Sequence, residues 1–229
     1  VVVTNTPSQT ITDAVAEQTF TLMMALAKKL KSADEFVREG SYHGFDPNLF
    51  IGTQLLGKTL GIVGLGRIGS VVARMAVKGM GMKVIYNNSS RREDFEKEFG
   101  ARFTTLDDLL PLSDFVTLHV PLTPETHHLI DSRKLVLMKR SAFIINTARG
   151  GIIAESDLVK ALEEGTIAGA GLDVFENENL VSTTLRLTDN VILTPHIASA
   201  TFESREEMSR IAAENIIAVL SGRKPLNPA

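Results

Sequence analysis

The chain has 229 residues, of which 44% are hydrophobic and 22% charged, a composition typical of a globular domain and unlike that of a disordered chain. A net charge of −3 leaves no basic excess for nucleic acid, so no nucleic-acid partner is expected. No cysteine is present, and no apolar run reaches the roughly 18 residues of a membrane span, which excludes a disulfide scaffold and predicts no membrane partner. A reducing, cytoplasmic compartment fits this composition.

The first predicted element is a single amphipathic helix over residues 13–37, with Thr12 or Asp13 as its cap, because apolar residues recur there every three or four positions. Residues 40–53 contain glycine and proline breakers and are predicted to form an apolar loop, here called the arm. The arm can pack either on a partner subunit or on its own domain. Its large apolar side chains are Tyr42, Phe45, Leu49 and Phe50.

From residue 58 onward, short apolar strands alternate with helices. Strands are predicted over 59–63, 83–86, 101–103, 115–120, 142–146, 168–174 and 191–193. Helices are predicted over 68–78, 93–99, 106–110 (closed by Pro111), 131–138, 155–164 and 203–220. This alternation predicts an α/β fold with a doubly wound parallel sheet of the Rossmann type.

A glycine loop of the form GxGxxG connects the strand at 59–63 to the following helix, which is the context that a dinucleotide site requires. Gly64 permits the tight turn, Gly66 lets the backbone approach a pyrophosphate, and Gly69 lets the helix pack close to the strand. The helix N-terminus then favours the negative phosphates. The alternative is a glycine turn without a ligand. It explains less well why an apolar strand precedes the loop and an amphipathic helix follows it.

The segment that follows the second strand indicates which dinucleotide binds. An acidic residue about 20 positions after the loop normally binds the adenosine ribose, but this segment carries no carboxylate. Its amides, hydroxyls and guanidinium groups can bind a 2′-phosphate instead, which predicts NADP as the preferred cofactor and NAD as a possible one. An ordinary polar turn with two solvated arginines is the alternative. The residues concerned are Asn87, Asn88, Ser89, Arg91 and Arg92.

Three chemically active residues each follow a predicted strand: Arg149, Glu178 and His196. Parallel sheets bind ligands at the carboxyl ends of their strands. A guanidinium there can hold a carboxylate and polarise the neighbouring carbonyl, and an imidazole paired with a carboxylate can exchange a proton with the substrate oxygen. Together they predict hydride transfer between a nicotinamide and a small 2-oxo or 2-hydroxy acid.

Each of these residues is weak evidence when taken alone, because a loop arginine is usually a surface charge and a lone histidine is usually structural. His119, His127 and His128 are rival histidines. Without cysteine or a His-x₃-His spacing, none of them predicts a metal site.

Six motifs in chain order resemble those of the D-isomer-specific 2-hydroxyacid dehydrogenases, and glyoxylate/hydroxypyruvate reductases in particular. They are TNTP at 4–7 with Ala16-Glu17, GLGRIG at 64–69, HVPLTPET at 119–126, INTARGG at 145–151, GLDVFENE at 171–178 and TPHIAS at 194–199. The resemblance implies that Arg149 binds and polarises the substrate, that His196 is the acid/base and that Glu178 is its partner. It also implies cofactor contacts from Arg67, Ile68, Val120, Pro121, Thr126, Thr147, Ala148, Asp173 and Ser199.

The chain departs from the family pattern at two places within these motifs. Asn179 replaces the usual proline after the catalytic glutamate. The run 78–82 looks one residue longer than is common, so Asn87 and Asn88 can exchange roles; the resemblance itself puts Asn88 at the usual acidic position.

The same resemblance implies a domain division and a quaternary state. Family members have two lobes, so residues 1–12 are expected to be a remnant of the substrate lobe, 13–196 the Rossmann domain, and 197–229 a helix returning to that lobe. Most of the substrate lobe would then precede Val1, and turnover by this chain alone would be reduced. A homodimer is expected. A non-catalytic binding module, similar to the family's nucleotide-sensing corepressors, is the alternative function.

Overall fold

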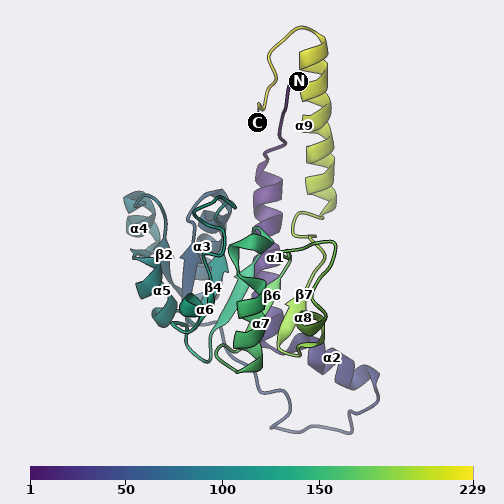
Figure 1. Cartoon of the computed structure of the whole chain (residues 1–229). Helices are drawn as coiled ribbons and strands as arrows, with labels where there is room; N and C mark the ends of the chain where they lie inside the picture. Colours follow the sequence, from purple (N-terminus) through teal and green to yellow (C-terminus); the bar gives the residue numbers. More distant parts are fainter. Residues whose placement is uncertain (229) are drawn as a thin grey trace.

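The computed structural model describes residues 1–228, and at its centre lies a seven-stranded sheet in which all strands are parallel (Figure 1). The strand order is β3-β2-β1-β4-β5-β6-β7, so the winding direction reverses between β1 and β4. The strands are β1 Thr59–Val63, β2 Lys83–Asn87, β3 Arg102–Phe103, β4 Phe115–Leu118, β5 Phe143–Asn146, β6 Gly169–Leu172 and β7 Val191–Leu193. The predicted doubly wound α/β fold is confirmed.

Helices cover both faces of this sheet. In chain order, the helical segments of the described residues are α1 Gln9–Ala27, α2 Leu30–Arg38, α3 Arg67–Met80, α4 Glu93–Phe99, α5 Leu106–Leu112, α6 Ser132–Leu135, the 3₁₀ turn Gly150–Ile152, α7 Glu155–Glu163, α8 Thr183–Leu187 and α9 Phe202–Leu220. Buried side chains of α1, α3 and α4 pack on one face, and those of α5, α6, α7 and α8 pack on the other.

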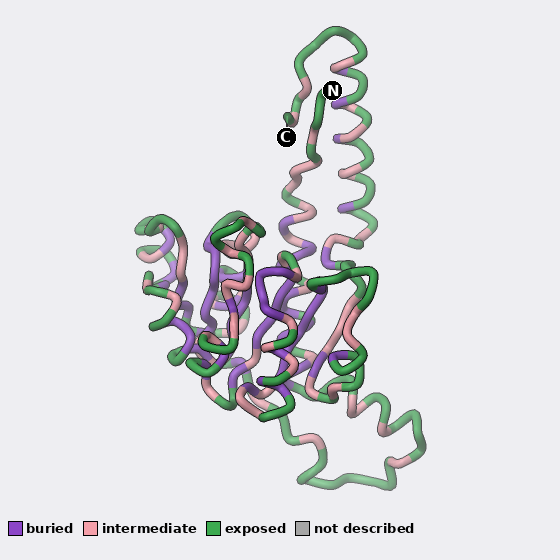
Figure 2. Tube along the Cα trace, viewed as in Figure 1, coloured by how far each residue is buried: buried purple, intermediate pink, exposed green. Residues whose placement is uncertain are grey.

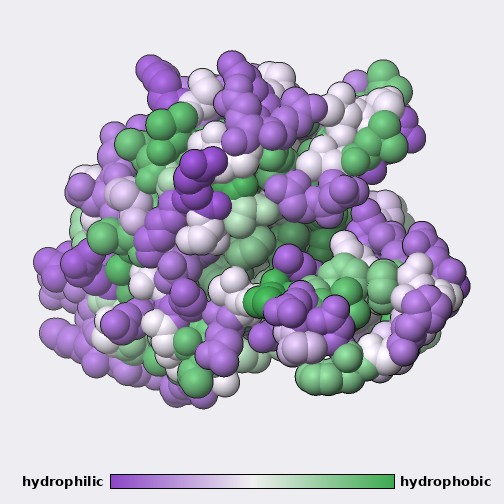
Figure 3. All heavy atoms as spheres, turned by 90° about the horizontal axis from the view of Figure 1, so that it is seen from below, coloured by the Kyte–Doolittle hydropathy of each residue, from purple (hydrophilic) through white to green (hydrophobic). Residues whose placement is uncertain are grey.

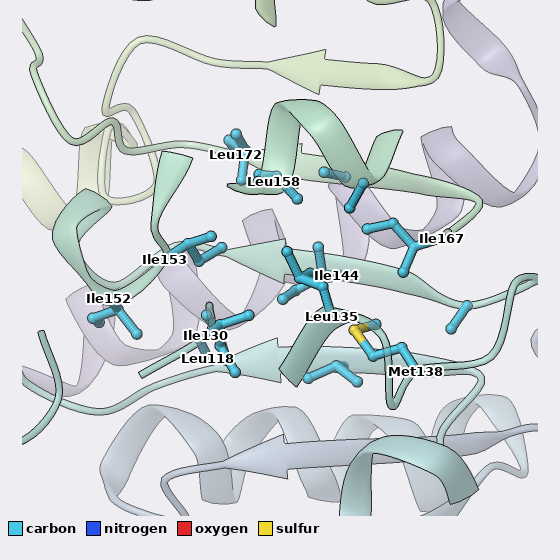
Figure 4. Packing of buried hydrophobic residues seen from close by; sticks show 14 of the residues in the cluster. Leu118, Ile130, Leu135, Met138, Ile144, Ile152, Ile153, Leu158, Ile167 and Leu172 are labelled. Atoms are coloured by element: carbon cyan, nitrogen blue, oxygen red, sulfur yellow. The ribbon is translucent and has the colours of Figure 1, made fainter. Parts of the chain in front are cut away.

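The two cores follow from the alternation of side chains along each strand. Phe115 and Ile145 point into the core beneath α1 and α3, whereas their neighbours Val116 and Ile144 point into the core beneath α6 and α7. Figure 4 shows this second core, in which branched aliphatic side chains from β4, β5, β6 and the covering helices interlock. Each such fully buried side chain contributes about 1.5–3 kcal/mol to the free energy of folding. Burial on both faces therefore holds the strands in register.

The predicted single helix over 13–37 is wrong, because the structure has two helices there. α1 begins at Gln9, where the Ser8 hydroxyl accepts the Ile11 amide proton, and not at the predicted caps. Between α1 and α2, Lys29 adopts a left-handed backbone with φ 52°, which ends a helix. The arm then returns to this break, since the Thr53 amide donates to the Ala27 carbonyl at 2.7 Å.

Several predicted boundaries also differ. The strands expected at 115–120 and 168–174 are shorter, because the chain turns into loops at their carboxyl ends. The helix expected at 131–138 covers only Ser132–Leu135, while α5 includes Pro111, in contrast to the prediction that this proline ends it. α8 was not predicted; its sequence is short and has one buried side chain, Leu185, so it carries little periodicity.

The two chain ends lie together, away from the sheet (Figure 1). Thr4 and Pro228 form an antiparallel bridge, and the Asn5 amide donates to the Asn227 carbonyl at 3.0 Å. α9 projects beyond the sheet beside this pair, and most of its surface is exposed or half-buried (Figure 2). Among the described residues, no helix has the length and apolarity to cross a membrane.

Candidate active site

The glycine loop lies between β1 and α3, beside the point where the winding direction reverses, which is where doubly wound sheets bind ligands. Gly64 has φ 98°, and a Cβ there would lie 2.8 Å from the backbone of His119. A Cβ on Gly69 would lie 2.2 Å from the Gly64 carbonyl oxygen, so only glycine allows α3 to pack this closely. Around Gly66 no atom lies within 4 Å of such a position, so its backbone faces open space in front of the helix N-terminus.

This arrangement fits a dinucleotide pyrophosphate. The first turn of α3, which includes Arg67 and Ile68, presents backbone N–H groups that the helix itself cannot use. The space beside Gly66 is open, and the helix dipole favours negative charge at this end of α3.

The polar segment after β2 approaches the same loop. The side-chain Oδ1 of Asn88 accepts the Leu65 amide proton at 3.2 Å, whereas the Asn87 side chain donates to the Thr104 carbonyl at 3.0 Å, away from the loop. Of the two asparagines, Asn88 therefore faces the glycine loop. Ser89 is exposed beside it.

The two arginines of this segment differ in position. Arg92 donates from Nη1 to the Leu65 carbonyl at 3.3 Å, so its guanidinium reaches the glycine loop. Arg91 forms a two-pronged ion pair with Glu96 of α4, with distances of 2.9 and 2.7 Å. Hydrogen bonds from Arg91 and from Tyr86 lower the pKa of Glu96, so this carboxylate stays charged and holds Arg91.

The loop after β4 is closed by a hydroxyl. Thr126 donates to the Pro121 carbonyl at 2.5 Å and accepts the Thr123 amide proton at 2.8 Å. The Thr126 hydroxyl therefore stabilises the turn that follows Val120, and its hydrogen bonds are made within that turn. Burial lowers the pKa of His119, just before this turn, to about 4, which favours a neutral imidazole.

Arg149 is exposed at the end of the loop that follows β5. The Asn146 side chain fixes this loop, because it accepts the Ala148 amide proton at 3.0 Å and donates to the Arg149 carbonyl at 2.9 Å. Gly150 then lies directly against the neighbouring segment: a Cβ there would be 1.9 Å from the carbonyl carbon and oxygen of Phe175. The arginine loop and the segment leading to Glu178 are thus held in contact.

His196 and Glu178 form a pair. The imidazole Nδ1 lies 2.8 Å from the Glu178 Oε1, and both side chains are about half exposed, at 48% and 49%. Since Nδ1 is bound to the carboxylate, Nε2 is left to meet a ligand. The structure therefore brings together His196 and Glu178, two of the residues that the sequence singled out. It also sets the Arg149 loop beside the segment that leads to Glu178.

The buried carboxylate of Asp173 fixes the loop that carries His196. It accepts the amide protons of Ile197 at 3.0 Å and Ala198 at 2.8 Å, and the Thr194 hydroxyl at 2.5 Å. The His196 amide donates to the Asp173 carbonyl at 2.9 Å, and His196 itself has a left-handed backbone with φ 53°. Ser199 follows this loop and is half-buried.

Two residues of α1 that sequence reasoning missed also contact these loops. The Thr19 hydroxyl is 3.0 Å from that of Thr147 in the buried interior, and the Gln18 side chain donates to Thr194 at 3.2 Å. They lie in the same helix as the predicted apolar stripe, so their spacing gave no signal. Their contact with the site loops becomes visible only in the structure, where α1 packs against β5 and β7.

A separate cavity of about 520 Å³ lies at the opposite edge of the sheet, between the end of α1, the arm and the amino ends of β5, β6 and β7. It contains neither the glycine loop nor any member of the predicted catalytic trio. This cavity is therefore distinct from the carboxyl edge, which carries those groups.

The chain matches the model of the D-isomer-specific 2-hydroxyacid dehydrogenase NAD-binding domain over residues 20–198. It is 49% identical to the glyoxylate reductase of Thermococcus litoralis, over 98% of this chain and 69% of that protein. A solved protein of Thermus thermophilus superposes with a TM-score of 0.93 at 41% identity, over 100% of this chain and 71% of its own.

A further solved relative was crystallised with a cofactor. This NADPH-dependent glyoxylate/hydroxypyruvate reductase of Sinorhizobium meliloti, in complex with NADP and malonate, superposes with a TM-score of 0.88 at 34% identity. The superposition covers 100% of this chain and 70% of that one. Nothing in these comparisons supports the alternative of a non-catalytic binding module.

The tight contact at Gly150 generates a testable prediction. Gly150→Ala places a methyl group 1.9 Å from the Phe175 backbone, so it should lower the free energy of unfolding by about 1–3 kcal/mol. Gly151→Ala is the matched control, because its Cβ would meet Leu122 and His127 at ordinary distances of 3.4–3.5 Å. Urea denaturation of both variants checks this, and equal stability losses would contradict the close packing of the two loops.

Proposed function

Because this chain belongs to the D-isomer-specific 2-hydroxyacid dehydrogenases, an NAD(P)-dependent class of oxidoreductase, we propose that it reduces a short 2-oxo acid of the glyoxylate or hydroxypyruvate type. The observation that carries this proposal is the 2.8 Å pair of His196 and Glu178, set beside the Arg149 loop at the carboxyl edge of the sheet.

The residues would divide the chemistry as follows. A nicotinamide, when bound, supplies the hydride that reaches the carbonyl carbon. His196, protonated and held at Nδ1 by Glu178, donates its Nε2 proton to the carbonyl oxygen and takes it back in the reverse direction. Arg149 pairs with the substrate carboxylate. It also stabilises the negative charge that grows on the substrate's carbonyl oxygen.

The proposed cofactor site runs along the carboxyl edge from β2 to β7. The pyrophosphate would lie at Gly64, Gly66, Arg67, Ile68 and Gly69, and the adenosine end at Asn87, Asn88, Ser89, Arg91 and Arg92. The nicotinamide half would lie along Val120, Thr147 and Asp173, and further cofactor contacts would come from Pro121, Thr126, Ala148 and Ser199. The open space beside Gly66 and the order of the strands support this assignment.

His196→Ala should remove the proton donor while leaving cofactor binding almost unchanged, since the imidazole serves the substrate oxygen. We expect kcat for glyoxylate reduction to fall by roughly 10²–10⁴. The assay follows NAD(P)H oxidation, and fluorescence titration measures cofactor affinity. Both measurements are made on this chain and on the same chain joined to the amino-terminal part of a longer relative. His43→Ala, in the exposed arm, is the control. Full turnover by the His196 variant would refute its role.

We further propose that NADP(H) is preferred over NAD(H). The segment after β2 carries no carboxylate facing the loop, and Arg92 already reaches the Leu65 carbonyl. Its existing partner, Asp94, is exposed and bonded at only 3.3 Å, so this guanidinium can turn to a 2′-phosphate. Arg91 is held more firmly by Glu96 and would contribute less.

Replacing the two arginines separately tests the cofactor proposal. Arg92→Ala should weaken NADPH binding about tenfold, the value of one charge-assisted hydrogen bond at a partly exposed site, and leave NADH binding unchanged. Arg91→Ala is the matched control and should have the smaller effect, because breaking its pair with Glu96 removes no group from the glycine loop. Equal affinity of the parent chain for both cofactors would contradict the preference.

A homodimer is proposed on the basis of the arm and α2. Both expose apolar side chains. Seen from below, the molecule shows hydrophobic groups scattered among hydrophilic ones (Figure 3). Phe45 is 90% exposed, and a monomer gains nothing from displaying such a ring. A two-fold contact would bury these residues on both subunits. The exposed set comprises Leu30, Val37, Tyr42, Phe45, Leu49 and Ile51.

Phe45→Asp combined with Ile51→Asp should convert the dimer to a monomer, since each change places a charge in the apolar contact. Sedimentation velocity at micromolar concentration measures the outcome. Leu187→Asp is the control, because this leucine of α8 is also strongly exposed, at 76%, but lies outside the arm. A parent chain that sediments as a monomer would refute the dimer.

We also propose the domain division 1–12, 13–196 and 197–229. The pairing of Thr4 with Pro228 and of Asn215 with Asn227 supports grouping the two chain ends, and α1 runs unbroken across the boundary at residue 12. A cytoplasmic location is proposed from the cysteine-free composition, which suits a reducing compartment.

A further inference from the structure

Three metal-ligating side chains meet outside the catalytic pair: His127, His128 and Glu176. Each offers one ligand atom, and these atoms all lie within 4.8 Å of one another. The two imidazole rings stack with centroids 3.9 Å apart, and His128 Nε2 lies 2.7 Å from the Glu176 Oε1. The adjacent histidines come from the turn after β4, and the glutamate follows β6.

The backbone places the two rings side by side. The His127 amide donates to the Thr123 carbonyl at 2.9 Å, and the His128 amide donates to the Gly151 carbonyl at 2.8 Å. Successive side chains of an extended chain point to opposite sides, but His128 has a left-handed backbone with φ 50°, which removes this alternation. An uncommon conformation for a non-glycine residue is thus maintained where two imidazoles converge.

The carboxylate is oriented by a further contact. The second oxygen of Glu176 accepts the Glu155 amide proton at 3.1 Å, and the Glu176 amide donates in return to the Glu155 carboxylate at 3.1 Å. These two hydrogen bonds fix the orientation of the Glu176 carboxylate, and the Glu155 carboxylate lies next to it.

We propose that His127, His128 and Glu176 bind a divalent transition-metal ion of the Zn²⁺ or Co²⁺ type. Two imidazole nitrogens and one carboxylate oxygen form a known three-ligand set for such ions, with water in the remaining position. The ion would replace the hydrogen bond between His128 and Glu176. Mg²⁺ and Ca²⁺ are disfavoured, because they take oxygen ligands. Bound there, the metal would join the turn after β4 to the loop after β6.

This site is separate from the proposed reductase chemistry. The catalytic pair of His196 and Glu178 offers one imidazole and one carboxylate, and within residues 1–228 no third such side chain joins it. A transition metal should therefore prefer the three-ligand cluster. The hydrogen bonds between Glu155 and Glu176 correspond to the outer contacts that orient metal ligands in proteins.

Titration of the chelator-treated chain with CoCl₂, followed by visible absorption, tests the proposal, and calorimetry with ZnCl₂ confirms the stoichiometry. We expect one saturable site. His127→Ala and Glu176→Gln should each weaken binding about tenfold or more. His43→Ala and His196→Ala should bind like the parent, which distinguishes the cluster from the arm histidine and from the catalytic pair.

Three outcomes would overturn the site: no saturable binding by the parent chain, parent-like binding by His127→Ala, or loss of binding in His196→Ala alone. Circular dichroism checks the fold of each variant. If Glu176→Gln does not fold, His127→Ala decides the question, because this histidine is exposed and makes no side-chain hydrogen bond among the described residues.

Discussion

The common direction of the seven strands is the constraint on which the site depends. Because every strand is parallel to its neighbours, each carboxyl end emerges at the same edge of the sheet. The glycine loop follows β1, the Arg149 loop follows β5, Asp173 follows β6, and His196 comes three residues after β7. Groups from distant parts of the chain thus lie along one edge of the sheet.

A buried charge then sets the fine geometry at this edge. Asp173 has no exposed surface, and an isolated carboxylate in that environment would be strongly destabilising. Its donors offset this cost, and two of them are the backbone amides that directly follow His196. The left-handed backbone of His196 is unfavourable for a residue with a Cβ. Asp173 therefore holds in place a conformation that the local sequence would not adopt alone.

The sequence predicted the architecture well because its signals were local and periodic. β1, α4 and β7 have the predicted bounds, and the loops bearing Gly64, Arg149 and His196 lie at the predicted edge. The single helix over 13–37 was wrong, because apolar spacing continues through Lys29 and does not reveal its left-handed backbone. The ion pair of Arg91 with Glu96 was also not predicted from the sequence, since it depends on how α4 packs beside β2.

The cluster of His127, His128 and Glu176 shows the same limit more sharply. Sequence spacing gave no metal pattern, because the third side chain lies 48 positions away and the histidines are adjacent. Only the parallel pairing of β4, β5 and β6 brings the turn at 123–128, the 3₁₀ turn and the segment after Phe175 together. Contacts between these loops join them to one another as well as to the sheet: Gly150 abuts Phe175, and Glu155 bonds to Glu176. The loops are therefore ordered during folding, so a ligand that binds at this edge meets side chains already close to their working positions and has less conformational entropy to overcome.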